Sequence, residues 1–215
     1  MIIKVCGISR GEDLISVSRL PVNYAGFVFD AASPRFAEPG IDPDLVALLG
    51  RSAPSMKKAG VFTNGDEIDI REKILRFQLD AIQLNRETSP EFCASFAGET
   101  AVIKTFTIHG PESFSATFAY EGSCKYFLFE VANGLTGTTD PFDWSVLNEY
   151  IGSTPFLLEG FGPGDLKNIY DIRHSQFAGI DIDTRFEMFP GKKDIPSLTG
   201  FITSLKAISQ ELPRL

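Results

Sequence analysis

Cysteine, histidine and tryptophan are scarce in this sequence. Its 215 residues include three cysteines (Cys6, Cys93 and Cys124), two histidines and one tryptophan. The cysteines are odd in number and widely spaced, without a Cys-x-x-Cys pair, which argues against a disulfide framework or a zinc site and is typical of a reduced, cytoplasmic protein. His109 and His174 have no partner at ligand spacing, so we expect both to be structural or surface residues and expect no bound metal.

Basic residues and long apolar runs are also lacking. The chain has 20 Lys and Arg against 28 Asp and Glu, a formal net charge of −8, which argues against the basic face that a nucleic-acid binder needs. A small anionic ligand remains compatible, because a few local Lys and Arg residues can hold it. No apolar stretch approaches the roughly 18–20 residues of a membrane span, and no basic segment followed by an apolar run opens the chain. We therefore expect neither a membrane anchor nor a signal peptide.

No low-complexity tract, charge block or linker divides the chain. Gly and Pro are scattered as turn residues rather than gathered in one place. A chain of this length buries one substantial core. We expect a single domain over residues 1–215.

Short runs rich in β-branched and aromatic residues recur, each followed by a segment with helical spacing. The apolar residues of these runs are consecutive rather than alternating, as in parallel strands that are buried on both faces. We predict strands at 2–5, 24–29, 59–62, 81–84, 101–106, 126–130, 155–158 and 178–182. We predict helices at 11–19, 43–49, 67–77, 90–97, 112–120, 142–150, 163–172 and 195–210.

Eight strand–helix units of about 27 residues each predict an α/β fold, a (β/α)8 TIM barrel. The alternative is a doubly wound open sheet, which normally has fewer strands and whose Gly-x-Gly-x-x-Gly turn is missing after the first strand. In either fold the chemistry lies at the carboxyl ends of the strands. Cys6 follows the first strand at that end, and its alternative role is that of a small buried core thiol.

Several short motifs occur in an order and spacing that are specific only when taken together. They are Lys4-Val5-Cys6-Gly7-Ile8, Glu12-Asp13, Gly26-Phe27-Val28-Phe29, Ser33-Pro34-Arg35, Gly60-Val61-Phe62, Asp80-Ala81-Ile82-Gln83-Leu84, Phe142-Asp143-Trp144, 179–187 and 190–194. With them the sequence resembles the phosphoribosylanthranilate isomerase family over nearly its whole length. The resemblance implies a (β/α)8 barrel that catalyses an Amadori rearrangement of N-(5-phosphoribosyl)anthranilate in tryptophan biosynthesis. It also implies that no cofactor or metal is used, and that the protein is a monomer or a homodimer.

The rearrangement needs an acid at the furanose ring oxygen and a base at C2′. The resemblance implies that Cys6 is the base and that Glu130, where the family has Asp, is the acid; the alternative for Glu130 is a strand-end carboxylate that faces solvent. Arg35 is implied to bind the anthranilate carboxylate, a task that suits a planar guanidinium. Lys4 lies on the same strand face as Cys6, where its ammonium either stabilises the thiolate or is paired for structural reasons alone.

The phosphate-binding loops depart most from the family pattern. In the family, backbone amides of the seventh and eighth loops hold the phosphate, and Glu159-Gly160-Phe161 stands here where Ser-Gly-Gly is usual. An acidic residue beside a dianion is repulsive, so phosphate binding requires Glu159 to turn away and Phe161 to adopt an allowed backbone angle. The substrate-binding residues that we expect besides Arg35 are Gly134, Gly160, Gly162, Asp183, Thr184 and Arg185.

Further departures lie at other strand ends. Asn85-Arg86 replaces the family's His-Gly after the fourth strand, and the sixth loop keeps little of its glycine-rich turn. Two other functions therefore stay open. One is an enzyme on the same scaffold that acts on another small carboxylated or phosphorylated sugar, and the other is a barrel that binds a ligand or a protein without catalysis. Unaltered Cys6 and Arg35 favour the isomerase, whereas Glu159 favours the alternatives.

Overall fold

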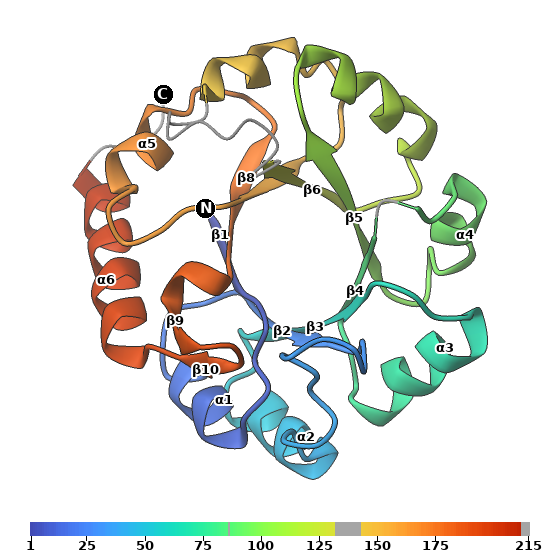
Figure 1. The fold of residues 1–215 in the computed structure, drawn as a ribbon, viewed down its shortest axis with the longest axis vertical. Coiled ribbons are helices and arrows are strands. Elements are labelled where there is room, and N and C mark those ends of the chain that lie inside the picture. Colours follow the sequence, from blue (N-terminus) through green and yellow to red (C-terminus); the bar gives the residue numbers. More distant parts are fainter. Residues whose placement is uncertain (86, 132–142, 212–215) are drawn as a thin grey trace.

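Eight parallel strands close into a barrel in the order of the sequence (Figure 1). The computed structural model describes residues 1–85, 87–131 and 143–211. The strands are β1 (Ile2–Val5), β2 (Tyr24–Val28), β3 (Lys57–Phe62), β4 (Ala81–Leu84), β5 (Ala101–Ile108), β6 (Tyr126–Val131), β7 (Phe156–Glu159) and β8 (Phe177–Ile182). Closure between β8 and β1 confirms the (β/α)8 TIM barrel and excludes the open sheet.

A helical segment follows each strand and lies outside the ring of strands (Figure 1). These segments are α1 (Gly11–Val17), α2 (Pro43–Ser52), α3 (Glu67–Arg76), α4 (Pro90–Ser95), η1 (Pro111–Tyr120), η2 (Trp144–Glu149), α5 (Leu166–Asp171), η3 (Thr184–Phe186) and α6 (Ile195–Glu211), where η marks a 3-10 helix. The predicted helix starts at Pro43 and Pro90 are confirmed. Asp42 accepts the amide of Asp44 at 2.9 Å, and Ser89 accepts the amide of Phe92 at 3.2 Å.

Some elements differ from the sequence prediction. Segment η1 is a 3-10 rather than an α-helix, and its Ser115 and Thr117 hydroxyls donate to main-chain carbonyls three residues back. Helix α5 begins later than Pro163 because the Asp165 carboxylate accepts the amide of Gly162 at 2.7 Å and holds that stretch as a turn. The antiparallel hairpin of β9 (Glu187–Phe189) and β10 (Lys192–Lys193) was not predicted.

The barrel interior is apolar near the amino ends of the strands and polar near their carboxyl ends. Alternate residues of each strand point inward. The apolar layer near the amino ends consists of Tyr24, Ala59, Ala81, Ile103, Leu128 and Leu157. Two residues further along β6 and β7 come Glu130 and Glu159, so alternation places both on the same inward face as this apolar layer.

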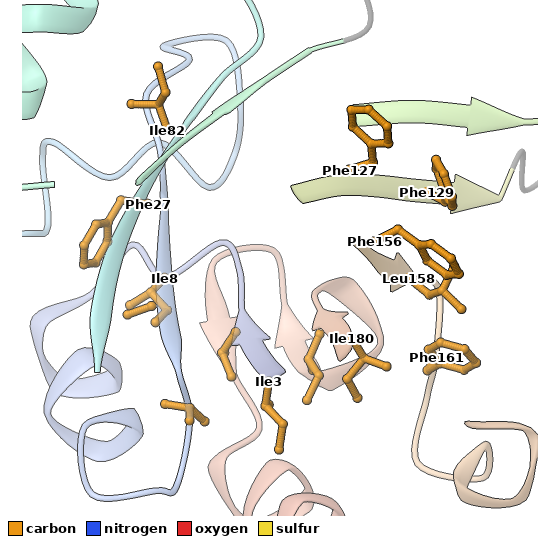
Figure 2. Packing of buried hydrophobic residues seen from close by; sticks show 14 of the residues in the cluster. Ile3, Ile8, Phe27, Ile82, Phe127, Phe129, Phe156, Leu158, Phe161 and Ile180 are labelled. Atoms are coloured by element: carbon orange, nitrogen blue, oxygen red, sulfur yellow. The ribbon is translucent and has the colours of Figure 1, made fainter. Parts of the chain in front are cut away.

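The aromatic core on the outside of the barrel fixes this alternation in β6. Phe127 and Phe129 are buried in this core, and Figure 2 shows their rings on the strand next to the one that carries Phe156 and Leu158. The Phe129 ring lies 4.9 Å from Phe156, 5.2 Å from Tyr150 and 5.3 Å from Phe114, measured between ring centroids. Because these rings are held on the outer face, the residues between and after them face the barrel interior.

Candidate active site

A cavity of about 200 Å³ opens at the carboxyl ends of the strands. It is lined by Cys6, Val28, Ser33, Arg35, Val61, Phe62, Thr63, Gln83, Asn85, Thr105, Glu130, Glu159 and Asp183. The structure thus brings together four residues that the sequence predicted as site residues, Cys6, Arg35, Glu130 and Asp183. Glu130 faces this cavity rather than bulk solvent, and the Thr107 hydroxyl donates to its Oε1 at 2.5 Å.

The Cys6 thiol shares the barrel interior with a buried ion pair. Lys4 Nζ donates to Asp181 Oδ2, and neither side chain is exposed. Burial alone would lower the pKa of Lys4, but the Asp181 carboxylate outweighs it and the pKa is raised. Lys4 is therefore paired inside the barrel, and its ammonium also acts to lower the pKa of Cys6, so the structure shows part of both roles left open above. Its ammonium does not by itself keep Cys6 ionised, since burial raises the pKa of the thiol to about 12 despite the opposing effect of Lys4.

Glu159 lies against the cavity that holds Cys6, which corrects the expectation that it turns away. The reason is strand alternation, because residue 159 shares the inward face of Leu157. Burial and the nearby carboxylates of Asp181 and Asp183 raise the pKa of Glu159 to about 8. At neutral pH Glu159 is mainly an uncharged carboxylic acid, so its repulsion of a phosphate dianion is much smaller than the sequence alone suggests.

Arg35 is held by a carboxylate from the far end of the chain. Its Nε donates to both Glu187 oxygens at 3.0 Å, and its Nη2 donates to Oε2 at 2.8 Å. Lys193, which is fully buried, donates to Glu187 Oε1 at 2.9 Å. Gly7 allows this arrangement, because its φ is +73° and a Cβ there would lie 2.9 Å from Arg35 Cδ. Burial would raise the pKa of Glu187, but the bonds from Arg35 and Lys193 outweigh burial and lower it.

Of the residues predicted to bind the phosphate, Asp183 lies in the cavity lining, whereas Gly160, Gly162, Thr184 and Arg185 do not. Gly160 and Gly162 follow Glu159, and Thr184 and Arg185 follow Asp183. A Cβ on Gly162 would lie 3.0 Å from Arg185 Cδ, so the seventh and eighth loops are in contact. Gly134 and Arg86 lie outside the described residues.

Phe161 does not obstruct these loops. The ring stacks on Trp144 with centroids 4.7 Å apart and planes at 22°. Phe161 is 2% exposed, and its φ is not positive. Its side chain is thus packed into the layer of helices, which confirms that an allowed backbone angle accommodates a non-glycine residue here.

His174 is structural and His109 lies on the surface, as predicted. The His174 ring nitrogens bond to main-chain atoms, Nε2 to the oxygen of Tyr150 at 2.9 Å and Nδ1 to the amide of Gln176 at 3.0 Å. His109 is exposed. Among the described residues, no group of three or more His, Cys, Asp or Glu side chains is arranged to hold a metal ion. No helix in the described ranges is long and apolar enough to cross a membrane.

Sequence reasoning did not single out the polar residues Thr63, Gln83 and Thr105 of the cavity lining, nor Asp181, Glu187 and Lys193, which bond to other residues around the site. Asp181 had a usable signal, since it lies two positions before Asp183 and thus on the same strand face. Gln83 likewise alternates with Ala81 into the barrel. Strand alternation gives no such signal for Glu187 and Lys193, because the bonds of Glu187 to Arg35 and to Lys193 depend on the turn after β8 and on the β9–β10 hairpin.

A closed (β/α)8 barrel with a thiol and several carboxyls around one cavity at the carboxyl ends of its strands is a barrel enzyme equipped for acid–base chemistry. The family model for N-(5′-phosphoribosyl)anthranilate (PRA) isomerase matches residues 3–204. The chain belongs to this family of isomerases.

Individual relatives agree with this assignment. An N-(5′-phosphoribosyl)anthranilate isomerase from Parabacteroides distasonis is 40% identical over 208 residues, covering 95% of this chain and 93% of the relative. A crystal structure of phosphoribosyl anthranilate isomerase in complex with reduced 1-(o-carboxyphenylamino)-1-deoxyribulose 5-phosphate has a TM-score of 0.78 at 26% identity, covering 96% and 100%. A monomeric form of the dimeric Thermotoga maritima isomerase has a TM-score of 0.75 at 25% identity, covering 96% and 99%. The two alternative functions are not favoured.

Proposed function

We propose that this isomerase converts N-(5-phosphoribosyl)anthranilate to 1-(2-carboxyphenylamino)-1-deoxyribulose 5-phosphate, an Amadori rearrangement in tryptophan biosynthesis. One observation carries the proposal. A single cavity combines the Cys6 thiol and the Glu130 carboxyl, a base and an acid, with the Arg35 guanidinium, a group that binds carboxylates. The substrate is a small phosphorylated molecule, and the protein acts in the cytoplasm as a monomer or a homodimer, without a nucleic-acid or membrane partner.

In this scheme Glu130 donates its proton to the furanose ring oxygen while the C1′–oxygen bond breaks, leaving a protonated Schiff base. The Cys6 thiolate then removes the C2′ proton, and the product of this step is an enolamine. Return of that proton to C1′, with loss of the proton on the C2′ hydroxyl, gives the aminoketose. The thiolate is the minor form of Cys6 at neutral pH, because burial raises its pKa.

The surrounding groups are suited to the rest of the substrate. Arg35 binds the anthranilate carboxylate, and Asp183 Oδ1 and Gln83 Oε1 are buried acceptors that receive no hydrogen bond from the described residues, so ribose hydroxyls can donate to them. The phosphate lies against the seventh and eighth loops, with the contacting residues Gly160, Gly162, Asp183, Thr184 and Arg185. The phosphate then replaces the Asp165 carboxylate as the acceptor for the Gly162 amide.

The test is turnover of phosphoribosylanthranilate generated in situ, with the product identified by chromatography against an authentic standard. Wild-type protein should form the aminoketose, and Glu130→Gln should lower kcat by orders of magnitude with the fold intact. Glu130→Asp, which restores the family residue, should keep or raise kcat. Near-wild-type turnover by Glu130→Gln would remove Glu130 from the role of acid. No product from folded wild-type protein would contradict the proposed reaction itself.

A further inference from the structure

The contact between Arg35 and Glu187 uses only one edge of the guanidinium. Nε and one N–H of Nη2 donate to the two oxygens of the Glu187 carboxylate in a bidentate contact. Among the described residues, none accepts a hydrogen bond from Arg35 Nη1. Arg35 also lines the cavity that contains Cys6 and Glu130. The end of the guanidinium formed by Nη1 and the outer N–H of Nη2 is therefore the part that remains for a second carboxylate.

Glu187 is itself held in place. Its side chain is 3% exposed, and Lys193, with a side chain that is not exposed at all, donates to Oε1 at 2.9 Å. The Lys193 amide donates to the buried carboxylate of Asp13 at 3.0 Å, which anchors the β9–β10 hairpin to α1. Displacing Glu187 from Arg35 would leave a carboxylate and a lysine in a site with little access to water, at a large cost in desolvation. The substrate therefore binds beside Glu187 and does not replace it.

We propose that Glu187 is a positioning residue that orients Arg35, so that the free end of the guanidinium meets the carboxylate of the substrate's aromatic ring. Lys193 fixes Glu187 and balances its charge. This inference rests on the proposed function, and it adds the reason why Arg35 recognises a carboxylate in one orientation. Ordering a long side chain before binding removes an entropic cost that the substrate would otherwise bear.

The experiment compares two substrates in wild-type protein, Glu187→Gln and Glu12→Gln. The substrates are N-(5-phosphoribosyl)anthranilate and the corresponding phosphoribosyl derivative of aniline, which lacks the carboxylate. Glu187→Gln keeps the size of the side chain but loses the charge-assisted bidentate contact with Arg35. Glu12→Gln is the matched control, because Glu12 pairs with the neighbouring Lys192 and does not touch Arg35.

For the natural substrate we expect Glu187→Gln to raise KM by about tenfold with kcat within roughly threefold of wild type, as expected for a lost binding contact. For the aniline derivative we expect the same variant to match wild type, and Glu12→Gln to match it with both substrates. If Glu187→Gln raised KM equally for both substrates, Glu187 would have a general structural role and the proposal would be overturned. A lower KM in Glu187→Gln would also overturn it, by showing that Glu187 competes with the substrate. Absence of wild-type turnover would contradict the proposed function instead.

Discussion

The Lys4–Asp181 pair offers the clearest test of what holds the barrel interior together at the active-site end. Both side chains are fully buried, and their Cα atoms are register partners on β1 and β8, where the barrel closes. Replacing Lys4 by Met leaves the Asp181 carboxylate buried without its cation. Removing one member of a buried pair costs about 3–5 kcal/mol, because the remaining charge keeps its desolvation penalty. For a chain of this size, that corresponds to a fall in Tm of roughly 6–20 °C.

The assay is urea unfolding followed by circular dichroism, with m compared between variants to check that the extent of unfolding is unchanged. Lys4→Met and Asp181→Asn should each lose stability in the stated range, and Lys4→Met combined with Asp181→Leu should recover most of the loss. The exposed pair of Lys167 and Asp171 on α5 is the control, and its disruption should leave the free energy of unfolding unchanged within error. A loss below about 1 kcal/mol in both single variants would show that this buried ion pair does not stabilise the barrel.

Three further predictions concern Glu159, Cys6 and Phe129. The raised pKa of Glu159 means that the folded state keeps a proton that the unfolded state releases, so folding stability falls as pH rises from about 5 to 8. In Glu159→Gln the free energy of unfolding should fall by about 2 kcal/mol less over this pH range than in wild type, allowing for partial exposure. If urea unfolding gave the same pH dependence for both proteins, the raised pKa of Glu159 would be contradicted. Alkylation of Cys6 by iodoacetamide, followed by mass spectrometry, should be slow at neutral pH and rise about tenfold per pH unit, whereas a plateau below pH 9 would show an ionised thiol. Phe129→Ala should cost about 3–5 kcal/mol in urea unfolding, and a cost under 1 kcal/mol would show that the aromatic cluster does not support β6.

Much of the barrel could be predicted because its strands are continuous apolar runs. Ile2–Val5 and Ala81–Leu84 have the predicted bounds, and the other strands differ by one to two residues at an end. The helical segments were harder to predict, since side-chain hydroxyls compete there with main-chain amides for the same carbonyl oxygens. In η1 the Ser115 and Thr117 hydroxyls bond to main-chain carbonyls, and this favours a 3-10 helix over the α-helix that apolar spacing predicts.

In the site, too, the residues in local sequence motifs could be predicted, whereas contacts between distant parts of the chain could not. Cys6 and Arg35 both line the cavity, as their positions in motifs that follow a strand indicate, and their roles stay predictions. The inward direction of Glu159 follows from strand alternation. Its raised pKa could not be predicted in this way, because it depends on the burial of the side chain and on the carboxylates of Asp181 and Asp183. Most distant of all is Glu187, which lies 152 residues from Arg35 in sequence. No local pattern predicts such a contact.

The most direct test of the account is the loss of phosphoribosylanthranilate fluorescence, measured with wild-type protein and with Cys6→Ser side by side. Circular dichroism of the two proteins establishes that both are folded. We expect turnover by wild type and a rate lower by orders of magnitude in Cys6→Ser, because the serine hydroxyl is a much weaker acid than the thiol and cannot serve as the base at C2′. Equal turnover in both proteins would contradict the central claim that the Cys6 thiol performs the proton transfer.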